Sequence, residues 1–158
     1  MIQWKDTFLF FCSSGVRSYN FTTEEWSPTF VSYFPASSLV AKIALLPNDQ
    51  VLIVGSYCPV CPSVAYIYNI TGQTWSNTGT PAKDPSSAAL VQLGQRYFLM
   101  GGISNVTEEY NYNTRAWSIV NTRPVNNYLF SPYYAPTSAI AVPAEMFASL
   151  PKGCQGIN

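Results

Sequence analysis

Hydrophobic residues along this chain gather in short continuous runs instead of recurring at the spacing of a helix face. The clearest runs are Phe8–Phe11, Val51–Val54 and Tyr97–Met100. Runs of this length that are rich in β-branched and aromatic residues, and that end at turn residues, are typical of buried strands. The pattern therefore predicts three buried strands spread over the chain.

A second set of strands is expected at Val40–Leu46, Ala88–Leu93 and Ser138–Val142. The segments Pro47–Asp49 and Gly94-Gln95 separate the first two of these strands from the apolar run that follows. Both segments consist of residues that favour tight turns. Each pair of strands is therefore expected to form a hairpin.

One aromatic motif recurs three times: a Tyr-Asn pair followed by a tryptophan at a constant distance. The tyrosine and the tryptophan lie seven positions apart in every copy. A threefold match of two uncommon residue types at one spacing is not expected by chance. The copies are Tyr19–Trp26, Tyr68–Trp75 and Tyr110–Trp117.

Together these signals define a unit of four antiparallel strands that recurs about every 45 residues, which matches one blade of a β-propeller. We therefore predict an all-β fold, a partial β-propeller of about three four-stranded antiparallel blades. In such blades the Tyr and Trp rings would pack between neighbouring sheets as large apolar side chains. The blades are expected at about 1–34, 35–82 and 83–126, with a fourth starting from 137, and 143–158 is expected to form a short helical turn and a Gly-rich tail.

A propeller typically needs four to eight blades to close a ring, and three blades cannot close one. The chain is therefore expected to be part of a longer propeller, or a short and marginally folded product. Because repeats are stabilised by their neighbours, the open blade faces would be adhesive and would favour self-association.

The unit resembles the kelch repeat. The resemblance rests on the aliphatic run before glycine, on Gly101-Gly102 and on the Tyr–Trp pair of all three copies, and it covers about residues 1–142. Cys12-Ser13 and Gly55-Ser56 replace the usual glycine doublet, so two of the units are degenerate. Kelch repeats form β-propellers, commonly six- or seven-bladed, and most serve as protein-interaction platforms. The resemblance implies the same fold and role here.

Charge and composition narrow the classes of partner. The 158 residues include eight Lys and Arg and eight Asp and Glu, and charged residues make up 10% of the chain. A balanced charge without a basic cluster argues against nucleic acid as a partner. The chain has no histidine, which excludes imidazole catalysis and His-ligated metals. The apolar runs fall far short of the about 20 residues of a membrane helix, so we expect no membrane span. No cofactor is expected either.

The cysteines offer one local pair, Cys58 and Cys61, in a loop between two strands. A disulfide is expected there if the chain matures in an oxidising compartment, and free thiols are the alternative. A redox motif would require a helix start, and a zinc site would require about four ligands. Cys12 follows a strand at a glycine-like position and is expected to be a small buried side chain.

Three Asn-x-Thr sequons begin at Asn20, Asn69 and Asn105. In a secreted protein they would be surface glycan acceptors, although Asn20 and Asn69 also suit a turn. The sequons and the low charge favour an extracellular chain, with a cytoplasmic location as the alternative. The first residues do not resemble a signal peptide, so a leader is expected upstream or not at all.

The function expected from these features is a non-enzymatic protein-interaction module. In a four-stranded blade the turns after the first and third strands lie on one edge and are tight here. The loops after the second strand and the connections after the fourth strand lie on the other edge and are long. Long loops on a rigid scaffold are where binding usually resides, and Tyr and Arg are enriched in binding hot spots. The candidate partner-binding residues on the long loops are Phe30, Tyr33, Phe34, Tyr57, Arg123, Tyr128, Phe130, Tyr133 and Tyr134.

Two alternatives stay open. The chain could be a fragment of a propeller enzyme or carbohydrate-binding protein that resembles galactose oxidase, with an active site outside this chain. It could also be a truncated product without a function of its own. Copper in such oxidases is held by Tyr and His ligands, and this chain has tyrosine but no histidine. No catalytic residue is expected within it.

Overall fold

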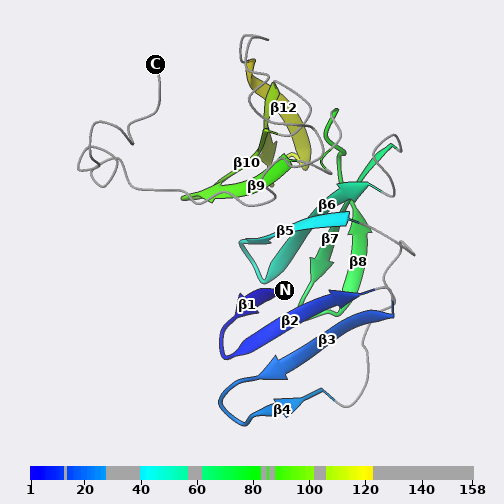
Figure 1. The fold of residues 1–158 in the computed structure, drawn as a ribbon, viewed down its shortest axis with the longest axis vertical. Coiled ribbons are helices and arrows are strands. Elements are labelled where there is room, and N and C mark those ends of the chain that lie inside the picture. Colours follow the sequence, from blue (N-terminus) through cyan, green and yellow to red (C-terminus); the bar gives the residue numbers. More distant parts are fainter. Residues whose placement is uncertain are drawn as a thin grey trace, which may run out of the picture.

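The computed structural model describes residues 1–12, 14–27, 40–56, 62–82, 85, 88–101 and 106–122. Within them the fold is all-β, with three four-stranded antiparallel sheets and no helix (Figure 1). We call the sheets blades 1, 2 and 3. Blade 1 contains β1 (Ile2–Trp4), β2 (Thr7–Cys12), β3 (Gly15–Asn20) and β4 (Glu25–Trp26); blade 2 contains β5 (Val40–Leu46), β6 (Gln50–Ser56), β7 (Ser63–Asn69) and β8 (Thr74–Asn77); blade 3 contains β9 (Ala88–Leu93), β10 (Arg96–Gly101), β11 (Val106–Asn111) and β12 (Ala116–Thr122).

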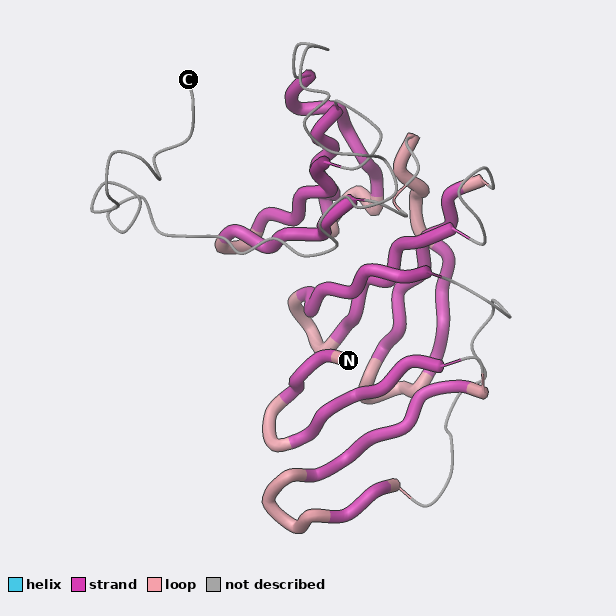
Figure 2. The backbone as a smooth tube through the Cα atoms, viewed as in Figure 1, coloured by secondary structure: helices cyan, strands magenta, loops and turns pink. Residues whose placement is uncertain are grey.

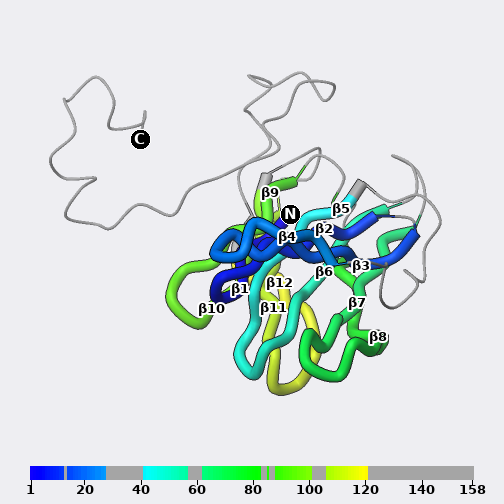
Figure 3. The backbone as a smooth tube through the Cα atoms, turned by 90° about the horizontal axis from the view of Figure 1, so that it is seen from below, coloured from blue at the N-terminus to red at the C-terminus, as the bar shows by residue number. Residues whose placement is uncertain are grey.

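Each blade is a simple meander in which every strand pairs with the next strand of the chain. The first strands, β1, β5 and β9, lie beside one another from blade to blade, as Figures 2 and 3 show. This is the arrangement of inner strands in a propeller, and the three sheets do not close into a ring. The predicted all-β fold of blade-like sheets is confirmed, with Val40–Leu46 and Ala88–Leu93 at their predicted bounds. The strand predicted at 138–142 and the helical turn and tail at 143–158 lie outside the described residues.

The core forms because blade 2 is buried on both faces. Side chains alternate along β6, so that Val51 and Ile53 pack against blade 1 while Leu52 and Val54 belong to the core shared with blade 3. All four side chains are fully buried. Burial of each contributes about 1.5–3 kcal/mol, which explains why this strand reads as a continuous apolar run instead of alternating with polar residues.

Each outer blade packs one face against blade 2. In β2, Leu9 and Phe11 face blade 2, and Phe8 lies on the opposite face with its cross-strand partner Tyr19. In β10, Tyr97 and Leu99 are buried and Tyr97 packs against blade 2. The sequence runs in the three blades look alike, but only the middle one is enclosed from both sides in the described part of the chain.

The recurring Tyr–Trp spacing arises from a hairpin between the third and fourth strand of each blade. The tyrosine and the tryptophan are direct cross-strand partners in all three blades. Their ring centroids lie 5.1, 4.8 and 5.1 Å apart in blades 1, 2 and 3, with tilts of 52°, 46° and 49°. Aromatic pairs of this geometry contribute about 0.5–1.5 kcal/mol beyond the area they bury.

The asparagine of the motif closes this hairpin. The Oδ1 atom of Asn20 accepts hydrogen bonds from the backbone N–H groups of Thr22 and Thr23, at 2.8 and 3.1 Å. Asn111 forms the same two bonds to Asn113 and Thr114, at 3.0 and 3.1 Å. In blade 2 Asn69 accepts one bond, from Gly72 at 2.6 Å. The constant Asn therefore acts as a turn residue in all three blades.

The last residue of each of these turns has a left-handed backbone. The φ angles are 59° at Glu24, 51° at Gln73 and 56° at Arg115, two positions before the tryptophan in every blade. A side chain with a Cβ atom is disfavoured there by about 1–2 kcal/mol, and glycine is not. The turn is therefore strained at a matching position in each blade.

Replacing Glu24 by glycine should relieve this strain. We expect Glu24→Gly to raise the free energy of unfolding by about 0.5–1 kcal/mol, because the steric relief exceeds the added chain entropy of glycine. Urea unfolding followed by tryptophan fluorescence measures the change. Thr23→Gly is the matched control in the same turn, where φ is not positive, and it should destabilise. Equal losses for both variants would contradict the strain.

Candidate functional site

The meander places two kinds of connection on opposite edges of the blades. The hairpin edge carries short turns at 5–6, 21–24, 47–49, 70–73, 94–95 and 112–115. The loop edge carries the connections between second and third strands and those between blades. One of them is shorter than predicted: Cys12 pairs directly with Gly15, so the β2–β3 connection is a two-residue hairpin instead of a long loop.

The predicted partner-binding residues all belong to connections that lie outside the described residues. The structure therefore does not bring them together or separate them. They are Phe30, Tyr33, Phe34, Tyr57, Arg123, Tyr128, Phe130, Tyr133 and Tyr134.

The described start of the connection between blades 2 and 3 is held against blade 3. Thr78 Oγ1 lies 2.6 Å from the Tyr110 hydroxyl, and the Trp117 indole N–H donates to the Gly79 carbonyl at 2.9 Å. The buried Glu108 accepts a bond from the Ala82 backbone N–H at 2.9 Å. This segment thus forms part of the blade interface rather than a free binding loop.

Gly79 is the point of closest approach in this segment. Its N–H donates to the Arg115 carbonyl at 2.9 Å, and a Cβ atom built on Gly79 would lie 2.6 Å from that same oxygen. Backbone atoms cannot move aside as a side chain end can. Only glycine therefore fits here without displacing the connection from blade 3.

We expect Gly79→Ala to lower the free energy of unfolding by about 1–3 kcal/mol, as overpacking does elsewhere. Thr80→Ala, at an exposed neighbouring position, is the control and should change stability by less than about 0.5 kcal/mol. Thermal or urea unfolding measures both. A Gly79→Ala protein as stable as the parent would show that the connection can shift freely.

The predicted modification sites are only partly visible. Asn20 and Asn69 lie at half-buried positions on the hairpin edge, with their Oδ1 atoms in turn hydrogen bonds. Asn105, Cys58 and Cys61 lie outside the described residues. Cys12 is exposed, with its thiol 3.3 Å from the Gly15 carbonyl, so the expected burial was wrong. It ends β2 at the loop edge, where no neighbouring blade covers it in the described residues.

Blade 1 has an aromatic face that points away from blade 2, which we call the open face of blade 1: Phe8, Phe10, Tyr19 and Trp26. The Phe10 and Trp26 rings lie 5.0 Å apart, and Trp26 is 48% exposed. Arg17 lies over the Trp26 ring at 5.0 Å. In blades 2 and 3 the same Tyr–Trp pair packs into the core with the preceding blade.

Blade 3 also has a face directed away from blade 2, formed by Val91, Leu93, Phe98 and Met100. Leu93 is 54% exposed, Phe98 and Met100 are half-buried, and Val91 is buried. At its margin Arg96 makes two hydrogen bonds to the Glu109 carboxylate, at 2.7 and 2.8 Å. These bonds lower the pKa of Glu109 and raise the pKa of Arg96. Such an exposed pair contributes little stability.

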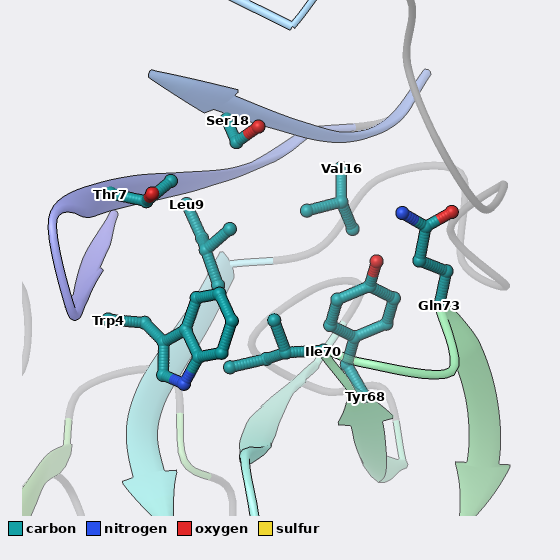
Figure 4. Close-up of a pocket in the computed structure, with 8 residues that line it drawn as sticks. All are labelled: Trp4, Thr7, Leu9, Val16, Ser18, Tyr68, Ile70 and Gln73. Carbon is teal, nitrogen blue, oxygen red and sulfur yellow. The ribbon is translucent and has the colours of Figure 1, made fainter. Parts of the chain in front are cut away.

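Blades 1 and 2 enclose a partly open cavity of about 260 Å³ near the hairpin edge (Figure 4). Leu9, Val16 and Ile70 form its aliphatic wall. The rings of Trp4 and Tyr68 form two further, aromatic walls. The polar groups of Thr7, Ser18 and Gln73 also line it.

The two aromatic walls of the cavity are fixed in place. The Trp4 indole N–H donates to Asp49 Oδ1 at 2.7 Å, and the Lys5 ammonium lies 4.3 Å from the Trp4 ring centre. The Tyr68 ring is held between Phe11 at 5.6 Å and Trp75 at 4.8 Å. Burial raises the pKa of Tyr68, so its hydroxyl stays protonated at neutral pH.

No feature of the sequence points directly to this cavity. Its residues come from β1, β2, β3, the end of β7 and the turn between β7 and β8, and they meet only when two blades stack. Ser18 was the available hint, because it stands where an apolar residue is expected on a buried face. That hint needs the strand register, which the sequence pattern alone does not supply.

Comparison with models of known protein families gave no match for this chain, and no curated protein sequence matches it. In the described ranges no group of three or more His, Cys, Asp or Glu residues is arranged to hold a metal ion. Nor does a helix long and apolar enough to span a membrane occur among the described residues.

Proposed function

We propose that this chain is a non-enzymatic protein-interaction module built from kelch-type blades. The observation that supports it is the open face of blade 1. This face carries the Tyr–Trp pair that blades 2 and 3 bury, together with Phe8 and Phe10. An aromatic surface of this kind on a rigid sheet is a favourable place for a protein partner.

The interfaces inside the chain indicate what would cover this face. In both of them, the Tyr–Trp face of one blade packs on the largely aliphatic face of the blade before it. Leu9 and Val16 of blade 1 pack in this way with Tyr68, and Leu52 and Ile67 of blade 2 pack with Tyr110. The fitting occupant is therefore another four-stranded sheet that presents an apolar face.

A second copy of this chain offers such a sheet. Blade 3 presents Leu93, Phe98 and Met100 on its face directed away from blade 2. If blade 3 of one copy docks on blade 1 of another, the contact continues the packing seen twice within the chain. Three sheets in each of two copies make six, and this number lies within the range of four to eight that closes a propeller.

The loop edge is the surface we propose for a further protein partner. The connection from blade 1 to blade 2 and the β6–β7 connection leave from this edge, and the aromatic residues and Arg123 predicted from the sequence lie in these connections or after β12. Long connections on a rigid scaffold commonly carry recognition. In a closed ring the loop edges of both copies would lie on the same side of the disc.

Self-association tests the head-to-tail arrangement. We expect the full chain to form a dimer in sedimentation velocity experiments over a range of concentrations. Phe10→Lys alters blade 1 and Met100→Lys alters blade 3. Each should weaken the dimer at least about tenfold, because an unpaired charge would be buried against an apolar surface. Thr114→Lys, on the hairpin edge, is the control and should leave the dimer unchanged.

Mixing the variants distinguishes this arrangement from others. Phe10→Lys retains a normal blade 3 face and Met100→Lys retains a normal blade 1 face, so an equal mixture should regain one interface and form a heterodimer. A Met100→Lys protein that stays dimeric alone would instead indicate contact between two blade 1 faces. A parent chain that is monomeric at all concentrations would reject the second copy as the partner.

A further inference from the structure

The two blade interfaces differ at one pair of matching positions. Ser18 is the cross-strand partner of Leu9 in blade 1, and Ile67 is the cross-strand partner of Leu52 in blade 2. Ile67 is only 2% exposed and fills the interface with blade 3. Ser18 is smaller and polar, so the corresponding region of the interface between blades 1 and 2 is left open as the cavity.

The matching tyrosines also differ. The Tyr110 hydroxyl has Thr78 Oγ1 as its partner at 2.6 Å. Tyr68 is 1% exposed, yet its hydroxyl makes no hydrogen bond within the described part of the chain. No fully buried polar side-chain atom there lacks a partner, so this hydroxyl must reach the solvent of the cavity. Figure 4 shows it directed toward the side where Val16 and Gln73 lie.

We propose that the cavity between blades 1 and 2 binds a small uncharged aromatic molecule through a hydrogen bond from the Tyr68 hydroxyl to an oxygen of the ligand. The lining contains no charged side chain, and a buried charge without a partner would be costly. The Trp4 and Tyr68 rings provide flat walls for an aromatic ring. A sugar carries a polar group on almost every carbon, whereas most of this lining is apolar or aromatic.

The volume sets the size of the ligand. A cavity of about 150 Å³ holds benzene, and this one is about 260 Å³. It therefore accommodates one ring with one or two small substituents and is below the usual size of a drug site. A ligand of this size is expected to bind with a Kd of about 1 mM or tighter.

The probe is 4-fluorophenol, whose ¹⁹F NMR signal should shift and broaden when it binds the full chain. Ser18→Ile copies the residue found in blade 2 and should fill the cavity, so that binding weakens at least about tenfold. Tyr68→Phe keeps the ring and should weaken 4-fluorophenol about three- to tenfold, with no change for fluorobenzene.

Two matched controls separate these effects from general changes. Ser76→Ile makes the same substitution at an exposed position of β8, and Tyr110→Phe removes the hydroxyl of the equivalent tyrosine in blade 3. Both should bind 4-fluorophenol like the parent. If circular dichroism shows that Ser18→Ile fails to fold, Tyr68→Phe decides between the outcomes.

Three results would overturn the proposal. The first is the absence of any ¹⁹F change of the probe with the parent chain up to about 10 mM, ten times the expected Kd. Binding that is unchanged in the Tyr68→Phe variant would place the probe elsewhere. Binding of galactose in place of 4-fluorophenol would assign the cavity to a different ligand class. Self-association of the chain is measured separately, so either proposal can fail alone.

Discussion

Packing of blade 2 between its two neighbours is the interaction on which the rest of the structure depends. Four successive residues of β6, Val51–Val54, are fully buried because each face of the sheet has a partner. Neither neighbour has this advantage within the described residues, since each packs only one face against another described sheet. Stability in such an array is shared between adjacent repeats, so the middle sheet is expected to be the last element to unfold.

The Tyr–Trp pair links the geometry of one blade to the packing of the next. Its constant spacing fixes the hairpin between the third and fourth strands, and its rings form part of the surface on which the preceding blade packs. Local structure and stacking therefore use the same two residues. Blade 1 keeps the motif although no described sheet covers it, so Trp26 stays 48% exposed there.

Strand positions could be predicted from the sequence because each signal is local. The apolar runs, the turn residues and the Tyr–Trp spacing each lie within a few residues of the strand they mark, and the bounds of β5 and β9 follow from them. The cavity could not be predicted in this way. It depends on which residue of β3 faces which residue of β7 across two sheets, and Ser18 and Tyr68 are far apart in the sequence.

The burial of Cys12 was predicted incorrectly for a related reason. Position within a repeat suggested a small buried side chain, whereas exposure is decided by the neighbouring blade, which does not cover that end of β2 in the described residues. The length of the β2–β3 connection likewise depends on strand pairing. Features that depend on contacts between distant segments were thus harder to predict from the sequence than features that depend on residues close together in the chain.

The turn asparagines have a practical consequence for anyone who studies glycans on this protein. A glycan would be attached to the amide nitrogen of Asn20 or Asn69, while the oxygen of the same amide closes the turn. Exchange of the asparagine would remove the acceptor and the turn closure together, and a loss of folding could be mistaken for an effect of the missing sugar. Substitution of Thr22 or Thr71 would abolish the sequon and leave the amide in place.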